Sequence, residues 1–204
     1  MQPTFRKATA ADSDLLADLV FGEEGSEGRR VTAAVLQLED IEKFRPLFRA
    51  LWKASENWRQ CEIALLEGES AGILMNNQPP DKITARVVLV AVRTFGLRVF
   101  ALRDRLRIFE RVHPKKPDGA YVISELDVLE QHRGKGLGTL MMERAEASAR
   151  AQGYKLMALQ TRTTNPARRL YERCGYEVAA EATDPEFERL TGVPGIVLYV
   201  KHLS

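Results

Sequence analysis

Three glycines and two cations share the stretch QHRGKGLGTLM, Gln131–Met141, which follows an apolar segment and precedes strong helix formers. Glycine is a poor helix former, but it tolerates positive φ and lets a ligand approach the backbone closely. The first turn of a helix leaves backbone N–H groups unpaired and carries partial positive charge. A strand, this glycine turn and a helix therefore predict an anion site that holds a pyrophosphate, with Arg133 and Lys135 adding positive charge.

The glycine spacing separates this stretch from other phosphate-binding motifs. A P-loop needs Gly-x4-Gly-Lys-Ser/Thr, which is missing here, and the dinucleotide fingerprint is G-x-G-x-x-G near the first strand. In this chain the glycines run G-x-G-x-G, late in the sequence. Gln131–Gly136 reads Q-x-x-G-x-G and resembles the coenzyme A signature of the GCN5-related N-acetyltransferases (GNAT).

A second block supports the same resemblance. NPARRLYERCGY (165–176) is similar to that family's downstream helix, in which an Asn-initiated turn leads to Leu-Tyr-Glu and then to Gly-Phe/Tyr. The resemblance covers most of the chain and implies an α/β (α+β) fold, with a mixed central sheet flanked by helices. The chain departs from the family by about forty residues between the third and fourth strands, a helical insert at about 78–118. The end of that insert, HPKKPDG, resembles the branch that includes puromycin N-acetyltransferase.

The resemblance implies acetyl-CoA as cosubstrate and a set of residues that bind it. The backbone of Leu126 and Val128, with Asp127 between them, is expected to pair with the pantetheine arm, and one amide is expected to polarise the acetyl carbonyl. Asn165 is expected to contact the cofactor, although the family's Asn falls one residue earlier, at Thr164. The residues expected to hold the pyrophosphate are Arg133, Gly134, Lys135, Gly136, Leu137, Gly138 and Thr139.

Two proton-transfer roles complete the expected site. By resemblance, Tyr171 is the general acid that protonates the departing thiolate, and a phenol with a pKa near 10 suits that task. The acceptor amine must lose a proton before it attacks. Glu125 and Asp127 lie two apart on one strand and share a face, so either is a candidate base, with Glu125 the first choice. A polar strand face paired with nearby arginines is the alternative reading of both carboxylates.

Two further segments invite a functional reading. The loop GEEGSEG (22–28) carries Glu23, Glu24 and Glu27, and its charge would favour a cationic amine; solubilising charge is the alternative. Residues 82–116 hold ten Lys/Arg against two Asp/Glu. Their apolar positions recur at helical spacing, which predicts an amphipathic helix over 82–111 that covers the sheet or a partner subunit. Such regular spacing also suits a homodimer seam.

The remaining elements must position these residues. The pattern predicts strands at 4–8, two within 61–77, 120–128, 155–161, 176–181 and 195–203. It predicts helices at 11–21, from 31 to about 53 with an interruption near Pro46, at 139–151 and at 165–173. We expect one domain over residues 1–204.

Composition excludes several classes of protein. The chain has 204 residues, 45% of them hydrophobic, and a net charge of +2, which gives no global attraction to nucleic acid or to a membrane surface. No apolar run of 18 residues is present, and the N-terminus lacks a signal pattern. Two cysteines fit a reducing compartment, so a cytoplasmic protein is the default. The three scattered histidines (His113, His132, His202) and the cysteines predict no metal site.

These observations predict an enzyme that transfers acetyl from acetyl-CoA directly to the primary amine of a small molecule, and the acidic loop would favour a cationic one. The large insert, which would narrow the cleft, favours a small acceptor. An enzyme acting on a protein N-terminus or lysine is the first alternative, and a non-catalytic acyl-CoA-binding module is the second.

Overall fold

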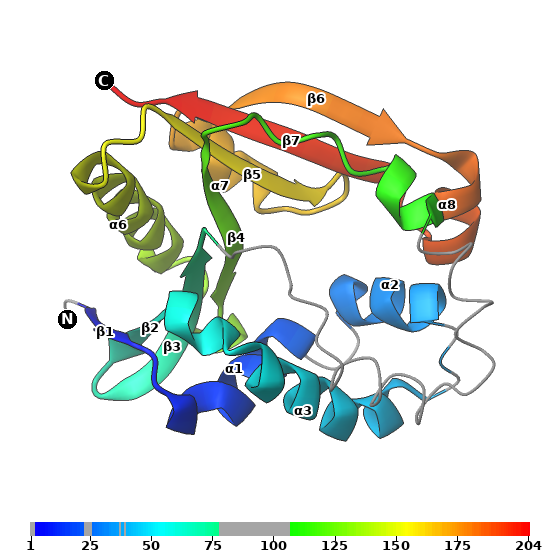
Figure 1. Ribbon diagram of the computed structural model, residues 1–204, viewed down its shortest axis with the longest axis horizontal. Coiled ribbons are helices and arrows are strands. Elements are labelled where there is room, and N and C mark those ends of the chain that lie inside the picture. The colour runs from blue at the N-terminus through cyan, green and yellow to red at the C-terminus, as the bar shows by residue number, and fades with distance from the viewer. Residues whose placement is uncertain (1–2, 23–25, 37, 39, 78–106) are drawn as a thin grey trace.

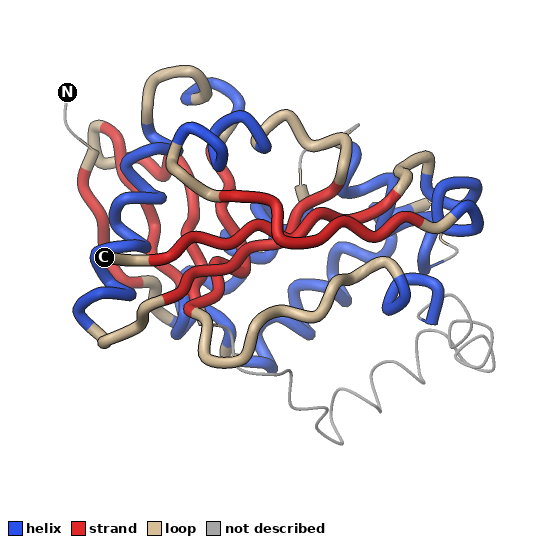
Figure 2. Tube along the Cα trace, turned by 90° about the horizontal axis from the view of Figure 1, so that it is seen from above, coloured by secondary structure: helices blue, strands red, loops and turns tan. Residues whose placement is uncertain are grey.

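The computed structural model describes residues 3–22, 26–36, 38, 40–77 and 107–204. Within these residues, seven strands form one sheet in the order β1-β2-β3-β4-β5-β7-β6 (Figure 1). β4 and β5 run parallel, and the other neighbours are antiparallel. Helices lie on both sides of the strands (Figure 2). The prediction of a mixed sheet flanked by helices is confirmed.

The strands lie where the alternating and apolar segments predict them. Their bounds are β1 Thr4–Lys7, β2 Cys61–Leu66, β3 Glu69–Asn76, β4 Tyr121–Val128, β5 Leu156–Arg162, β6 Glu177–Thr183 and β7 Gly195–His202. The turn between β2 and β3 places Glu67 and Gly68 at positive φ, as a tight hairpin requires.

The helices are α1 Ser13–Phe21, α2 Glu27–Leu36, α3 Arg45–Ser55, α6 Leu137–Ala151, α7 Arg168–Arg173 and α8 Pro185–Thr191. Short 3-10 turns precede or join them: η1 Ala10–Asp12, η2 Ile41–Phe44, η3 Asn57–Gln60 and η4 Glu130–His132.

The structure differs from the prediction at two places, the position of Pro46 in α3 and the presence of α8. Pro46 does not interrupt a helix but lies in the first turn of α3, where its missing N–H costs nothing. α8 was not predicted, although its signals are present. Asp184 accepts hydrogen bonds from the backbone N–H groups of Glu186 and Phe187, Pro185 opens the helix, and Gly192 ends it at φ 76°.

Three apolar clusters hold these layers together. The largest joins α6 and α7 to one face of β4, β5 and β7, around Met141, Leu159 and Tyr199. A second joins α1 and α3 to the opposite face of β2 and β3, around Leu16 and Ile63. The third packs α2, α8 and residues 107–112 together around side chains that include Phe187. The gap between the first and third clusters is where the predicted site residues lie.

Most of the predicted insert, residues 78–106, lies outside the described residues, and with it most of the predicted basic helix 82–111. Residues 107–111 are helical, as predicted. Across the described part of the chain, none of the helices combines the length and apolar character needed to cross a membrane.

Candidate active site

β4 and β5 pair over a short distance and then separate. Their parallel ladder covers Tyr121–Ile123 against Met157–Leu159, although both strands continue for several residues. Ser124–Val128 and Gln160–Arg162 then line opposite sides of a cavity of about 1710 Å³. The sheet therefore opens beside the carboxyl ends of two adjacent parallel strands, where no ladder among the described residues joins β4 to β5.

The backbone of Leu126 and Val128 faces this opening. Leu129 N donates to Ala71 O at 3.0 Å, which fixes the phase of the β3–β4 ladder. Alternation then directs the amides of Glu125 and Asp127 towards β3 and those of Leu126 and Val128 away from it. Arg133 Nε donates to Val128 O at 2.8 Å, consistent with a carbonyl on the open side. An extended ligand would find donors and acceptors along this edge.

The glycine turn leads from this edge into α6. Gly134 and Gly136 have φ of 73° and 83°, conformations that other residues adopt only with strain. A Cβ at either position would meet no atom within 4 Å, so open space lies above the turn. Leu140 N donates to Gly136 O, and the preceding N–H groups of α6 have no partner inside the helix. These features fit a pyrophosphate.

The other residues of the turn differ in what they do. Gly138 lies inside α6, and a Cβ there would approach Leu170 Cδ2 to 2.9 Å, so this glycine lets α6 and α7 pack closely. Lys135 Nζ donates to Gln131 O at 2.8 Å, and Lys135 is not among the described residues that line the cavity. Arg133 does line it and lies 3.7 Å from Asp127 Oδ1. Leu137 and Thr139 line it too.

Glu125 projects from β4 on the face opposite to Leu126 and Val128. It lines the cavity and is partly buried. Burial, followed by the charge of Asp127, raises the pKa of Glu125 to about 7, while the charge of Arg162 acts in the opposite direction. A carboxyl with a pKa near neutrality is able both to accept and to release a proton. Asp127 lines the same cavity but is paired with Arg133.

Tyr171 reaches the cavity from α7, on the other face of the sheet. Its ring packs against Tyr199 with centroids 5.8 Å apart, and its side chain is 6% exposed. Burial, followed by the charge of Glu125, raises the pKa of Tyr171 to about 12. Within the described residues its hydroxyl has no hydrogen-bond partner. The phenol therefore stays protonated near neutral pH and is available as a donor.

Asn165 lines the cavity, but both ends of its amide already bind protein atoms. Nδ2 donates to Thr161 Oγ1 at 2.6 Å, and Oδ1 accepts from Ala167 N at 2.9 Å. The N-cap of α7 is Ala167, so Asn165 lies in the turn before the helix and not inside the helix predicted at 165–173. This geometry supports an indirect role, in which Asn165 positions the turn that carries Tyr171.

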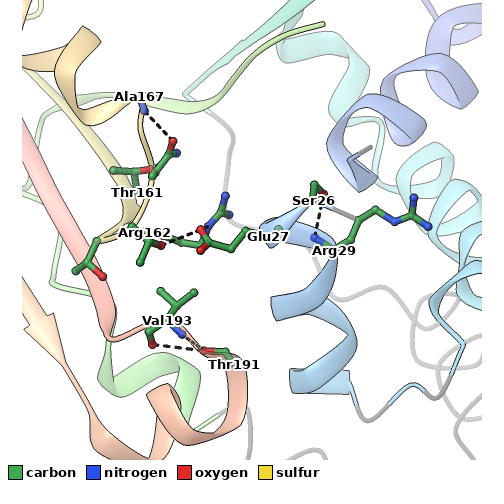
Figure 3. A network of polar contacts seen from close by, with 12 residues as sticks. Ser26, Glu27, Arg29, Thr161, Arg162, Ala167, Thr191 and Val193 are labelled. Atoms are coloured by element: carbon green, nitrogen blue, oxygen red, sulfur yellow. Dashed lines mark hydrogen bonds and ion pairs between the residues drawn. The ribbon is translucent and has the colours of Figure 1, made fainter. Parts of the chain in front are cut away.

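Glu27 belongs to the predicted acidic loop, and the structure gives it a partner. Its Oε2 accepts from Arg162 Nε and from Thr164 Oγ1, each at 2.8 Å, across the space between α2 and β5 (Figure 3). Burial acts to raise the pKa of Glu27, but these two hydrogen bonds and the charge of Arg162 outweigh it and hold the pKa below its usual value. Glu23 and Glu24 lie outside the described residues.

Several cavity residues were not singled out from the sequence. Arg162 ends β5 and lines the cavity, as do Phe109, Phe187 and Ile196 of the third apolar cluster. His113, predicted to begin a turn, also lines it. His113 Nδ1 lies 2.6 Å from Phe109 O, and because a carbonyl only accepts, this nitrogen carries the hydrogen. Of these residues, only Arg162 could have been found from the sequence, because it is a charged residue at the end of an apolar strand.

The described residues contain no group of three or more His, Cys, Asp or Glu side chains placed to hold a metal ion. Cys61 is buried, and burial raises its pKa to about 12. Burial likewise raises the pKa of the half-buried Cys174. Both thiols are therefore protonated and weakly nucleophilic at neutral pH.

The chain is similar to known proteins in sequence and in structure. The model of the family described as acetyltransferase (GNAT) family matches residues 37–176. A search of curated proteins finds no match.

Arylalkylamine N-acetyltransferase 2 from Aedes aegypti has a similar structure, with a TM-score of 0.65 and 16% identity over 100% of both chains. Polyamine N-acetyltransferase from Drosophila melanogaster has a TM-score of 0.58 and 18% identity over 99% of this chain and 100% of that one. Ard1 from Thermoplasma volcanium has a TM-score of 0.55 and 13% identity over 100% and 99%. At these identities the similarity concerns the fold.

Proposed function

The chain belongs to the acetyltransferase (GNAT) family and uses acetyl-CoA, and on that premise we propose that it transfers acetyl directly to the primary amine of a small molecule. The observation that carries this proposal is the shared cavity of the β4 edge, the glycine turn, Glu125 and Tyr171. A donor edge for the thioester arm and two proton-transfer groups thus meet in one space.

The binding roles follow from the backbone. The open amides of Leu126 and Val128 would pair with the pantetheine arm, and the α6 N-terminus with Gly134 and Gly136 would hold the pyrophosphate. Arg133 lies beside the same turn and would add positive charge. Bound acetyl-CoA supplies an activated thioester carbonyl and a thiol leaving group. A backbone N–H on the β4 edge would stabilise the negative charge that develops on that carbonyl oxygen.

The proton-transfer roles follow from the two perturbed side chains. Glu125 would take a proton from the ammonium of the acceptor, directly or through water, so that the neutral nitrogen forms the new C–N bond. The C–S bond breaks with its electron pair on sulfur, and Tyr171 would donate a proton to that thiolate. The nitrogen of the product then gives its remaining extra proton to the Tyr171 phenolate, directly or through water, and Glu125 releases its proton to solvent, which leaves an amide, a free thiol and the starting enzyme.

Direct transfer, without an acyl-enzyme, is supported by the state of the cysteines. The chain has two, and burial holds both as thiols. Neither offers the thiolate that a covalent route would need.

A small acceptor is supported by the lining of the cavity. It includes apolar side chains from three separate segments, Phe109, Phe187 and Ile196. Glu27 is already paired with Arg162, so the described residues lend little support to a cationic preference from the acidic loop. An acceptor on a protein N-terminus or lysine would need a groove open along its length, and a non-catalytic module would not need Tyr171 or Glu125.

Thiol release from acetyl-CoA across a panel of amines and short peptides tests the proposal. We expect turnover with at least one small primary amine and at least a hundredfold loss in Tyr171→Phe. Turnover with peptides alone would favour the protein acceptor. Binding of acetyl-CoA without thiol release for any acceptor would favour the non-catalytic module.

A further inference from the structure

Arg162 shares a sheet face with Glu125. On β4, Leu126 and Val128 pack against the cluster that contains α6, so Glu125, the residue before Leu126, lies on the other face. On β5, Leu159 belongs to the same α6 cluster, and alternation places Arg162 on the face of Glu125. The two strands have separated at this level, and both side chains line the cavity between them.

The guanidinium of Arg162 is held from the side of α2. Its Nε donates to Glu27 Oε2 at 2.8 Å, and the two side chains are only 31% and 24% exposed. A Cβ on Gly28 would lie 3.4 Å from Arg162 Nη1, so the missing side chain lets α2 approach the guanidinium closely. Figure 3 shows the two charged groups extending towards one another from α2 and β5. This pair is half-buried and geometrically fixed.

Glu125 is surrounded by four titratable groups from four different elements. Asp127 lies on its own strand, Arg162 on β5, Tyr171 on α7, and Cys61 on β2 feels the charge of Glu125. Among the charged groups acting on Glu125, Asp127 favours the protonated form and Arg162 favours the carboxylate. Arg162 therefore lowers the pKa of Glu125, in opposition to burial and to the charge of Asp127.

We propose that the Glu27–Arg162 ion pair sets the electrostatic environment of Glu125, and so the pH at which this carboxylate becomes available as a base. Arg162 is a positioning residue that acts through Glu125, and Glu27 controls how much of its positive charge reaches the site. This proposal rests on the proposed function, in which Glu125 is the base. It extends the reaction machinery to α2, a helix that contributes no proton-transfer group of its own.

The two halves of the pair make opposite predictions. Removing the cation in Arg162→Gln disfavours the Glu125 carboxylate, so the acid limb of the pH profile of kcat/KM should move up by about one pH unit. Removing the anion in Glu27→Gln leaves the cation uncompensated, so the limb should move down by a smaller amount. If the ion pair only links α2 to β5, both variants lose the same link, and their acid limbs should not move in opposite directions.

The experiment measures kcat/KM against pH for wild type, Arg162→Gln, Glu27→Gln and Glu125→Gln, with melting temperatures for each. Arg162→Lys keeps the charge and should leave the limb near its wild-type position, which separates charge from hydrogen-bond geometry. Thr164→Val removes the second hydrogen bond to Glu27 without changing any charge, and serves as a matched control whose limb should not move.

Opposite shifts in Arg162→Gln and Glu27→Gln support the proposal. If Glu125→Gln has lost the acid limb, Glu125 is the base. In that case, shifts in the same direction for Arg162→Gln and Glu27→Gln, or no shift in either, overturn the proposal, because the ion pair then does not tune Glu125. An unchanged limb in Glu125→Gln removes Glu125 as the base, and that failure belongs to the proposed function.

Discussion

The charge of Glu125 acts on the hydroxyl of Tyr171 although the two side chains approach from opposite faces of the sheet. This is possible because β4 and β5 have separated at that level, so the sheet no longer divides the two faces. A carboxyl with a raised pKa and a phenol with a raised pKa thus share one space. One is suited to accept a proton near neutral pH and the other to donate one.

Tyr171→Phe tests the donor directly. We expect kcat/KM to fall by about 10²- to 10⁴-fold, because the departing thiolate loses its proton donor. The affinity for acetyl-CoA should change little, since the ring and its packing against Tyr199 remain. Thiol release measures the first quantity and calorimetry the second. A variant that binds acetyl-CoA normally and turns over at the wild-type rate would remove Tyr171 from the mechanism.

The pH profile tests Glu125. The carboxylate is the active form, so kcat/KM should fall about tenfold per pH unit below a pH near 7 and stay level above it. Because burial and the charge of Glu125 raise the pKa of Tyr171 to about 12, no basic limb from loss of its proton should appear below about pH 10. An acid limb near pH 4.5 would contradict the role assigned to Glu125.

We also expect Glu125 to lower the stability of the folded protein when its carboxyl is ionised. Its pKa rises from 4.5 to about 7 on folding, so the folded protein binds this proton more tightly than the unfolded chain does. Stability from this group is therefore present below about pH 4.5 and is lost as the pH rises through 7. Glu125→Gln should then be more stable than wild type at pH 8, by on the order of 3 kcal/mol, but not at pH 4. Melting curves at the two pH values decide; a variant less stable at pH 8 contradicts the prediction.

The glycines of the turn should separate into two kinds. Gly136→Ala forces a side chain into φ 83° without any clash, so a cost of about 1–2 kcal/mol and at least a tenfold weaker affinity for acetyl-CoA are expected. Gly138→Ala instead presses on Leu170 and should affect mainly the packing of α6 on α7. Melting temperature and calorimetric Kd for both variants provide the comparison. Unchanged acetyl-CoA affinity in Gly136→Ala would refute the anion site.

Asn165→Ala tests a direct against an indirect role. Its two hydrogen bonds go to Thr161 and Ala167, so the variant should lose about 1–3 kcal/mol of stability and some turnover, with little change in Kd for acetyl-CoA. The Kd is measured by calorimetry, and the stability by denaturant unfolding. A large loss of affinity with unchanged stability would restore Asn165 as a direct cofactor contact.

The local patterns predicted the strands and the two chemical motifs, because each depends on near neighbours in the chain. Strand alternation placed Glu125 and Asp127 on one face, and the glycine spacing placed the turn before α6. The Glu27–Arg162 pair was not predictable, because it joins residues far apart in sequence through the packing of α2 on β5. His113 is a similar case, since the fold brings the end of the insert to the cavity.

The most direct test of the whole account is a titration of acetyl-CoA into ¹⁵N-labelled protein, followed at the backbone amides. Ligand between the separated strands should shift the signals of Leu126, Val128 and Gly136, with those of β1 and β6 unchanged. Saturable binding with this pattern is the predicted result. No binding, or shifts confined to other parts of the molecule, would contradict it.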